Sequence, residues 1–412
     1  MQLANTAPTI LTPSNASTEL KALPAFVRRG FAVGLKLRMG SLTVTVPDGR
    51  SFRIEAPEPG PDAAFTIHDW RFARRLLQGG DIGVGEAFMA GEWTSPDPTT
   101  FLELFAANRH VMSDALTGNP VARALVSVRH FLNRNSRAGS RRNIAAHYDL
   151  GNAFYEAWLD PSMTYSSAYF GAGANDLESA QRDKYRAIAE RTGIGPDDHV
   201  LEVGCGWGGF AEFAASEIGC RVTGITISQA QHAYAARRIQ DAGLSDRVSI
   251  ELVDYRDKQG AFDRIVSIEM FEAVGERFWP GYFQMLRERL RAGGQAGLQI
   301  ITVEDAHFDT YRRAPDFIQR YIFPGGMLPS PERVTDHARR VGLSPVAEAG
   351  FGIDYARTLA EWRDRFRAAW PRLAQGSFDE RFKRMWEFYL HYCEAGFRAG
   401  SIDVKQFVFA RP

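Results

Sequence analysis

A short segment near the middle of the chain, residues 202–208 (EVGCGWG), has the composition of a loop that binds a small molecule through its backbone. An apolar run ends at Glu202, and glycines then take alternate positions at Gly204, Gly206 and Gly208. Such a backbone can turn sharply and approach a ligand closely, because glycine has no side chain in the way. Dinucleotide-binding loops carry G-x-G-x-x-G and phosphate-binding loops end in Lys-Ser or Lys-Thr, and neither pattern occurs here. We therefore expect a ligand with a cationic centre and no phosphate, such as S-adenosylmethionine. Glu202 would either orient the loop or receive the amino-acid part of this cofactor.

Polar residues after the next two strands of this region would complete the cofactor site. After the third strand come Asp254, Tyr255 and Arg256, where a carboxylate can accept from an adenine amine while an aromatic ring covers the base. After the second strand many such enzymes carry an acid for the ribose hydroxyls, whereas this chain has Thr226. We expect Gln231, one helical turn later, to supply that polar contact.

Strands and helices alternate from residue 199 onward and would position these loops. The predicted strands are 199–205, 221–228, 248–253, 262–270, 295–302 and 404–410, and the predicted helices are 209–217, 229–241 and 279–290. Nearly continuous apolar strands separated by helices are typical of a parallel sheet buried on both faces. The predicted fold class is therefore α/β, a doubly wound Rossmann-like sheet, preceded by a smaller mixed α+β N-terminal domain.

The length of 412 residues suggests two domains, or one domain with an appendage. We expect a disordered tail over residues 1–20, an accessory domain that faces lipid over residues 21–135, and a catalytic domain over residues 136–412. The catalytic domain carries an insertion over about residues 303–340 that is rich in aromatic residues and arginine.

Local patterns in the accessory domain predict a hairpin and two helices. Residues 42–46 and 51–54 are expected to pair around a Pro-Asp-Gly turn. Residues 70–77 are expected to form a helix that stops at the glycine pair 79–80. An apolar-periodic helix over residues 101–133 is interrupted at a Gly-Asn-Pro sequence.

Charge and cysteine content exclude several functional classes. The formal net charge is +0, so no overall field favours nucleic acid. The three cysteines are too few and too scattered for a disulfide framework, and the nine histidines show no metal-binding spacing, so no metal is expected. Neither a signal peptide nor a run of about 18 apolar residues occurs, so we expect no membrane span and a reducing cytoplasm as the compartment.

A basic stretch without acidic residues separates Asp114 from Asp149. It contains Arg123, Arg129, Arg134, Arg137, Arg141 and Arg142. One interpretation is a solvated linker. The other is a basic surface for anionic lipid headgroups, to which each arginine near a bilayer adds about 1 kcal/mol. Both interpretations are open at this point.

Segments well beyond the glycine loop carry more specific motifs. They are GVGEAFMAGEW at 83–93, HYDLGN at 147–152, YSSAY at 165–169, FDRIVS at 262–267, MFEAVG at 270–275 and YIFPGG at 321–326. On these motifs the chain resembles the cyclopropane-fatty-acyl-phospholipid synthase family, which includes the mycolic acid methyltransferases. The resemblance covers roughly residues 140–412 and, more loosely, residues 70–100.

The resemblance implies transfer of a methyl group from S-adenosylmethionine to a cis double bond in a phospholipid acyl chain. The positions that match the family's cofactor contacts are Tyr165, Ser166, the glycine loop, Thr226, Gln231, Tyr255 and Arg256. An alkene is a weak nucleophile, so the enzyme must align it with the sulfonium at about 3–3.5 Å and exclude water. The resulting cation needs aromatic faces or carboxylates nearby, and then a base that removes a proton.

The resemblance also implies that this base is a bicarbonate ion, held by a cysteine, a glutamate, a histidine, an isoleucine backbone and a tyrosine. Glu272, Ile301 and Tyr355 match three of these positions. Ser167 stands at the cysteine position and Gln299 at the histidine position. Two side chains of the cradle therefore differ from the family pattern.

The altered cradle leaves two products open. Serine and glutamine can still bind an anion, so bicarbonate can stay and remove a proton from the new methyl, which closes a cyclopropane. Alternatively the base moves or is replaced, a neighbouring carbon loses the proton, and the product is a methylene or methyl-branched chain. For the whole protein the alternatives are a small-molecule methyltransferase of the same fold and a non-catalytic lipid-binding member.

Several aromatic segments and one cysteine have competing interpretations. Cys393 matches a family cysteine labelled catalytic, but alkene methylation needs no covalent thiol and a lone cysteine on an aromatic helix is usually core. Trp279, Tyr282 and Phe283 are interpreted as core rather than acyl tunnel. A denser set in the insertion is interpreted as a lipid entrance, namely Phe308, Tyr311, Phe317, Tyr321 and Phe323 with Arg312, Arg313 and Arg320.

The resemblance finally implies partners and a location. We expect unsaturated phospholipid acyl chains at the membrane surface as the partner, and no nucleic acid. We expect a cytoplasmic protein that is peripheral on the inner face of the membrane. The oligomeric state is open, and a homodimer is one of the states that the sequence allows.

Overall fold

The chain divides into two compact units in the computed structural model, which describes residues 7–109, 111, 150–313 and 315–412. Unit 1 comprises Met1–Arg129, Ala314–Tyr321 and Ala374–Ser401. Unit 2 comprises His130–Arg313, Ile322–Leu373 and Ile402–Pro412. The basic stretch, most of the predicted helix 101–133 and the first half of the HYDLGN motif lie outside the described residues.

The division differs from the contiguous domains expected at 21–135 and 136–412. Residues 314–321, from the middle of the predicted insertion, and residues 374–401, from near the C-terminus, belong to unit 1. The physical reason is aromatic packing across the sequence, because the ring of Phe388 contacts that of Phe88 at 5.6 Å and that of Phe317 at 4.6 Å between centroids. The insertion is therefore not a single structural element.

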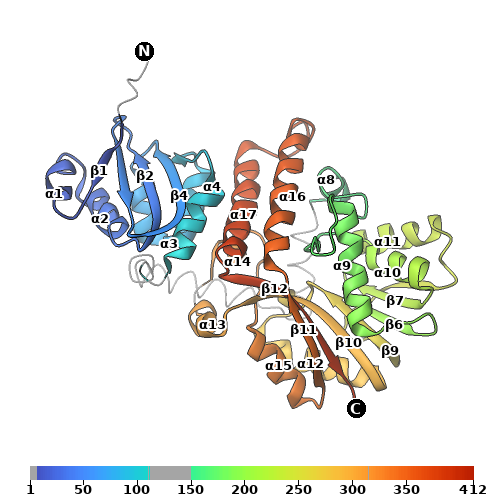
Figure 1. Cartoon of the computed structure of the whole chain (residues 1–412). Helices are drawn as coiled ribbons and strands as arrows, with labels where there is room; N and C mark the ends of the chain where they lie inside the picture. The colour runs from blue at the N-terminus through green and yellow to red at the C-terminus, as the bar shows by residue number, and fades with distance from the viewer. Residues whose placement is uncertain (1–6, 110, 112–149, 314) are drawn as a thin grey trace. The chain divides into compact units, whose positions relative to one another are not determined.

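Unit 1 contains a five-stranded sheet in the order β1-β3-β2-β4-β5 (Figure 1). Its strands are β1 (Thr9–Leu11), β2 (Met39–Thr45), β3 (Ser51–Glu55), β4 (Glu58–Ile67) and β5 (Trp93–Thr94). The predicted hairpin is confirmed, because β2 and β3 pair antiparallel. The prediction of a disordered tail is wrong for residues 9–11, which pair parallel with β3 and bury Leu11.

Helices cover the sheet of unit 1 and bring the GVGEAFMAGEW motif into its core. They are α1 (Ala16–Glu19), α2 (Ala25–Gly34), α3 (Arg71–Met89), α4 (Pro98–Ala107), α14 (Phe317–Tyr321) and α17 (Glu380–Arg398). The helix predicted to stop at the glycine pair instead continues through a kink at Gly80, whose φ of 57° and ψ of −132° only glycine adopts readily. Beyond the kink, Gly85 faces the rings of Phe317 and Phe388 so closely that a Cβ would lie 2.4 Å from Phe317.

Unit 2 is built on a seven-stranded sheet in the order β11-β12-β10-β9-β6-β7-β8. Its strands are β6 (His199–Val203), β7 (Arg221–Thr226), β8 (Val248–Leu252), β9 (Phe262–Ile268), β10 (Leu290–Val303), β11 (Ser344–Gly350) and β12 (Ile402–Ala410). All six predicted strands are present, and those from β6 to β10 are parallel neighbours. β12 runs antiparallel between β10 and β11, so the sheet is mostly but not wholly parallel.

Both faces of this sheet are covered, which confirms the doubly wound α/β prediction. The helices of unit 2 are α8 (Asn152–Glu156), α9 (Leu177–Thr192), α10 (Gly209–Phe213), α11 (Gln229–Asp241), α12 (Trp279–Arg289), α13 (Asp305–Tyr311), α15 (Pro331–Arg340) and α16 (Gly352–Leu373). Figure 1 shows α9, α10 and α11 on one side and α12 and α15 on the other, and each side has its own buried apolar cluster.

The aromatic residues of α12 lie in the core of unit 2, whereas those of the predicted insertion are divided between the two units. Trp279, Tyr282 and Phe283 of α12 are buried in the core of unit 2, as expected. Phe308 lies in the same core, and Phe317 belongs to unit 1. Among the helices that the structure describes, none combines the length and the low charge that a bilayer crossing requires.

Candidate active site

Three carboxylates lie at the carboxyl ends of adjacent strands in unit 2. Glu202 lies near the end of β6, Glu269 directly follows β9, and Glu272 lies in the 3-10 turn that comes next. β6 and β9 are parallel neighbours, so their ends meet at the same edge of the sheet. The sequence predicted Glu202 and Glu272 as site residues but not Glu269.

Glu269 is held by three hydrogen-bond donors. Its Oε1 accepts from the backbone N–H of Ser167 at 2.8 Å and from Nε2 of Gln299 at 2.8 Å. Its Oε2 accepts from the hydroxyl of Tyr355 at 2.7 Å. The backbone φ of Glu269 is 50°, in the left-handed region that costs a non-glycine residue about 1–2 kcal/mol. Such strain persists where the surrounding structure requires the side chain at that place.

Glu272 has fewer partners than Glu269. Its Oε1 accepts from the backbone N–H of Ile301 at 2.6 Å. Its Oε2 is buried, and no group in the described part of the chain bonds to it. Burial, together with the charge of Glu269, raises the pKa of Glu272 to about 8. Burial also raises the pKa of Glu269, but Lys184 and the three hydrogen-bond donors oppose that shift, whereas Glu272 has only backbone donors.

A buried lysine on α9 balances part of this negative charge. Lys184 is fully buried, and its Nζ donates to Oγ of Ser166 at 2.6 Å. Burial lowers its pKa to about 8, whereas nearby carboxylates, Glu269 first, oppose the shift. Sequence reasoning missed Lys184 because α9 is rich in charged residues. The available signal was its place on the buried stripe that Leu177 and Ile188 also occupy.

A chain of polar side chains fixes the orientation of Gln299. Nε2 of Gln406, on β12, donates to Oε1 of Gln299 at 3.0 Å, and the guanidinium of Arg191 donates to Oε1 of Gln406. Both glutamines are fully buried. Because the amide oxygen of Gln299 accepts from Gln406, its NH₂ group must point toward Glu269.

The structure brings together all five residues that were predicted to hold an anion, but around protein carboxylates. Ser167, Gln299 and Tyr355 donate to Glu269, and Ile301 donates to Glu272. The hydroxyl of Ser167 donates to the carbonyl of Ala168 and not to the site. The residues present do not fit a bicarbonate ion, since these donors are already used by carboxylates.

The glycine loop adopts a conformation that requires its glycines. The φ angles of Gly204 and Gly208 are both 85°, and a Cβ at Gly204 would lie 2.6 Å from Cγ of Met270. Gly206 has a φ of 53° and faces open space, because a Cβ added there would meet no atom within 4 Å. Cys205 in the same loop is buried, and burial raises the pKa of its thiol well above the usual value, so it is no nucleophile.

Glu202 provides an electrostatic match to a cationic cofactor. Its Oε2 is buried and has no hydrogen-bond partner in the described part of the chain. Burial raises its pKa well above the usual value, and Lys184 acts in the opposite direction. An ammonium or sulfonium group placed here would stabilise the charged form. The loop and Glu202 therefore fit S-adenosylmethionine, whose bound form would supply an electrophilic methyl group.

Further predicted cofactor residues lie on β7, on α11 and after β8. Oγ1 of Thr226 donates to Oε1 of Gln231 at 2.9 Å, so the two predicted ribose contacts are adjacent. Asp254 is buried, and both of its oxygens accept from the guanidinium of Arg256. If Asp254 accepts from the adenine amine, as predicted, the adenine and Arg256 must share its carboxylate.

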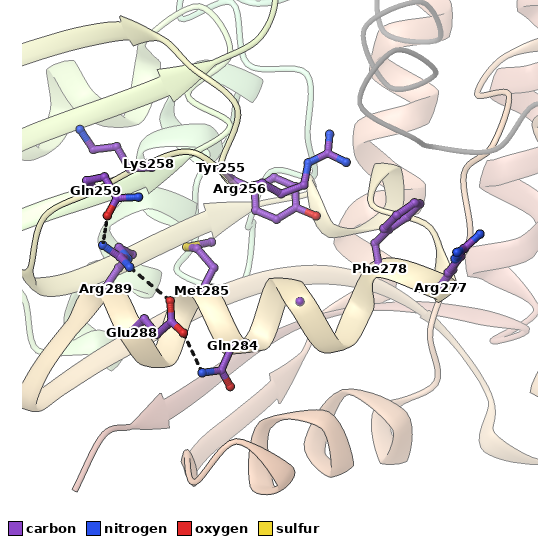
Figure 2. A pocket seen from close by; sticks show the side chains of 11 residues that line it. Tyr255, Arg256, Lys258, Gln259, Arg277, Phe278, Gln284, Met285, Glu288 and Arg289 are labelled. Atoms are coloured by element: carbon purple, nitrogen blue, oxygen red, sulfur yellow. Dashed lines mark hydrogen bonds and ion pairs between the residues drawn. The ribbon is translucent and has the colours of Figure 1, made fainter.

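Tyr255 and Arg256 line a pocket of about 360 Å³ beside α12 (Figure 2). Figure 2 shows them opposite the helix residues that close the pocket, which include Met285 and Glu288. The Tyr255 ring packs edge-on against Tyr282 at 5.4 Å.

A wall of aromatic rings joins the glycine loop to the carboxylates. The aromatic wall consists of Tyr155, Trp158, Tyr165, Tyr355 and Trp362. Tyr155 packs on Trp207 of the loop at 5.0 Å, Tyr165 lies 5.2 Å from Trp362, and Trp362 lies 6.0 Å from Tyr355. Ring faces next to carboxylates are a suitable environment for a carbocation.

Cys393 is placed in unit 1, on α17, and not on the sheet of unit 2. Its side chain is half-buried, and burial raises the pKa of its thiol, which keeps the thiol neutral. Within the described ranges, no three histidine, cysteine, aspartate or glutamate side chains are grouped to hold a metal ion.

Comparison with known proteins places this geometry in a family. The family model described as mycolic acid cyclopropane synthetase matches residues 135–407. The tuberculostearic acid methyltransferase UfaA1 of Mycobacterium tuberculosis is 40% identical over 371 residues, which cover 86% of this chain and 85% of the relative. The cyclopropane-fatty-acyl-phospholipid synthase of Escherichia coli is 35% identical over 379 residues, which cover 89% of this chain and 95% of the relative.

Solved structures agree with the sequence matches. The cyclopropane synthase MmaA2 from Mycobacterium tuberculosis has a TM-score of 0.61 and 30% identity, covering 66% of this chain and 98% of that one. The mycolic acid cyclopropane synthase CmaA1, complexed with S-adenosylhomocysteine (SAH) and CTAB, has a TM-score of 0.61 and 30% identity, covering 65% and 97%. The chain therefore belongs to the mycolic acid cyclopropane synthetase family and is an S-adenosylmethionine-dependent methyltransferase.

Proposed function

We propose that the protein transfers the methyl group of S-adenosylmethionine to the cis double bond of an unsaturated acyl chain in a membrane phospholipid. The observation that supports this most strongly is the buried pair of carboxyl groups, Glu269 and Glu272, next to an aromatic wall and the glycine loop. A site for methylation of an oxygen or nitrogen nucleophile has no need to stabilise a carbocation. The names of the relatives, a fatty-acyl-phospholipid synthase and a tuberculostearic acid methyltransferase, favour the same substrate class.

In this proposal, separate groups of residues bind the methyl donor and stabilise the cation. The glycine loop, Glu202, Thr226 and Gln231 bind the methyl donor, with Tyr165 and Ser166 on the side of the aromatic wall. The π electrons of the alkene form the new bond to the methyl carbon, and the electrons of the old bond leave with sulfur. The cation left on the other alkene carbon lies between aromatic faces and carboxylates, which stabilise it without solvent.

We propose that the protein reaches its lipid substrate while bound peripherally to the cytoplasmic face of the membrane. Unit 1 would face the lipid, and the six arginines between residues 123 and 142 would add affinity for anionic headgroups. The product follows from where the proton is removed. Loss from the new methyl closes a cyclopropane, and loss from a neighbouring chain carbon leaves a methyl-branched chain with a double bond. A methylene branch forms if a hydride first shifts to the cationic carbon, so that the methyl-bearing carbon becomes the cation and the methyl group loses the proton.

Expression in a host with monounsaturated lipids tests the proposal. We expect the host's unsaturated fatty acids to gain one methylene mass, which mass spectrometry detects, and its saturated fatty acids to stay unchanged. The matched control carries Gly206→Asp, which places a side chain and a negative charge in the cofactor loop. An unchanged fatty-acid profile, with cofactor binding shown by calorimetry, would point instead to a small-molecule substrate. A protein without cofactor binding would be a non-catalytic lipid-binding member.

A further inference from the structure

We infer that Glu269 is the proton acceptor of this reaction and that its carboxylate takes the place of a bound bicarbonate ion. The inference rests on the proposed function, because only methylation of an alkene leaves a proton to be removed from carbon. Three features support it, namely the donors around Glu269, the charge of the cluster and the side chain at position 299.

The donor set is the first argument. Ser167, Gln299 and Tyr355 supply a backbone N–H, an amide N–H and a hydroxyl, and all three donate to Glu269. A carboxylate can accept about four hydrogen bonds, so one acceptor position is left for a proton from the substrate. The backbone N–H of Ile301 is used by Glu272. A free anion would have to displace Glu269 from its donors.

The charge of the cluster is the second argument. A bicarbonate ion placed among these donors would stand beside the carboxyl groups of Glu269 and Glu272, and like charges at short range repel strongly in a buried site. One internal carboxylate with its own donors avoids that repulsion. Burial raises the pKa of Glu269, and Lys184 together with the three donors opposes that shift and favours the ionised form. The site therefore already contains the negative charge that an exchangeable base would bring.

The side chain at position 299 is the third argument. An imidazole loses or gains a proton near neutral pH, whereas the amide of Gln299 is a donor at any pH. Its orientation is fixed by Gln406, which in turn accepts from Arg191. A permanent, oriented donor suits a base that must stay ionised and in one position.

The proton balance of the step is complete without another reagent. After methyl transfer, a C–H bond of the new methyl group or of a carbon adjacent to the cationic carbon breaks, and its proton forms an O–H bond with Glu269. The electron pair of that C–H bond forms either the third side of a cyclopropane or a new double bond. Glu269 returns the proton to solvent when the product leaves, so the net products are the modified lipid, S-adenosylhomocysteine and a proton.

The backbone conformation of Glu269 allows its carboxylate to be removed without added backbone strain. Because its φ is 50°, Glu269→Gly relieves strain while it removes the carboxylate. The variant leaves a cavity lined by the three donors, which should bind a small carboxylate such as bicarbonate or formate. Glu269→Gln keeps the volume, leaves no such cavity, and serves as the matched control.

Turnover on vesicles of a dioleoyl phospholipid tests the inference, with carbon dioxide removed from the buffer and with bicarbonate or formate added. We expect the wild type to be equally active in both buffers. We expect E269G and E269Q to lose about 100-fold or more in turnover, as for other missing general bases. Added bicarbonate or formate should restore E269G in part and leave E269Q unchanged. Calorimetric binding of S-adenosylmethionine by both variants shows that they are folded.

Two results would overturn the inference. One is a wild type that is active only with bicarbonate, since the base would then be the free ion. The other is an E269G variant that folds, binds the cofactor and keeps its turnover without any added anion. Both leave the proposed function intact. A wild type that modifies no lipid in either buffer contradicts the proposed function itself.

Discussion

Gln299 donates from Nε2 to Oε1 of Glu269 at 2.8 Å, across the boundary between β10 and the loop after β9. Gln299 was recognised from the sequence as a departure from the family pattern, whereas Glu269 was not predicted as a site residue. Together they explain why the chain has an amide at this position.

Removal of this donor should change the pH dependence of the reaction. Gln299→Met keeps the length of the side chain but leaves Glu269 with one donor fewer, which disfavours its ionised form and raises its pKa. The rise of turnover with pH should therefore move to higher pH, with a loss of about tenfold at neutral pH. Gln406→Met removes the bond that orients Gln299 and the acceptor of Arg191 but no donor to Glu269, so it should give a smaller shift in the same direction. A pH–rate profile identical to the wild type in Q299M would contradict this role.

Glu272 should make the protein less stable as pH rises. Burial and Glu269 raise its pKa from 4.5 to about 8, so the folded state binds more protons than the unfolded state between these values. The contribution of protonated Glu272 to the free energy of unfolding is fully present below about pH 4.5 and is lost as the pH rises through 8. Glu272→Gln removes this dependence.

We therefore expect E272Q to exceed the wild type in stability by about 2 kcal/mol at pH 8, after allowance for solvent screening, and by little at pH 5. Urea unfolding at the two pH values measures the difference. An advantage of E272Q that is the same at both values would mean that Glu272 does not titrate in this range.

Substitution of Gly206 should weaken cofactor binding more than it weakens the fold. Gly206 and Gly243 both have positive φ, 53° and 68°, and both face open space. Alanine at either position should cost about 1 kcal/mol of stability from backbone strain. Only G206A should also lose affinity for S-adenosylmethionine, by about tenfold, because its methyl group points into the proposed site. Calorimetric titration separates the two, and equal affinities would remove Gly206 from the cofactor site.

Two glycines of one helix should behave oppositely in unit 1. Gly85→Ala places a methyl group 2.4 Å from Phe317 and should destabilise the protein by about 1–3 kcal/mol. Gly79→Ala, in open space on the same helix, should be neutral or stabilising by up to about 1 kcal/mol. Thermal unfolding measures both, and equal effects would show that the aromatic contact does not hold α14 and α17 in place.

Local sequence patterns were sufficient for most elements of unit 2. The bounds of α11 match the prediction at both ends, because Ser228 caps the first turn and accepts from the N–H of Gln231. β11 was missed because its residues are largely exposed at the edge of the sheet and lack an apolar pattern. The membership of α14 and α17 in unit 1 depends on rings that lie about 300 residues apart in sequence, such as Phe88 and Phe388, and no local pattern shows this contact.

The candidate site was predicted only in part, because its contacts also join residues that are distant in the sequence. Motif matching found Ser167, Gln299 and Tyr355, which lie far apart in sequence. It passed over Glu269, which stands between two matched segments, and Lys184, whose neighbours on α9 are mostly polar. One signal was available, since Gln299 and Gln406 are polar residues in the middle of apolar strands and such residues need buried partners.

Incubation of the protein with vesicles of unsaturated and saturated phospholipids, and with S-adenosylmethionine deuterated at the methyl group, tests most directly whether it methylates unsaturated acyl chains. Mass spectrometry of the lipids then shows where the label goes. We predict label in the unsaturated acyl chains alone, with the full deuterium content if a neighbouring carbon loses the proton and with one deuterium fewer if the transferred methyl loses it. Binding of the cofactor without any label in the lipid would contradict the account.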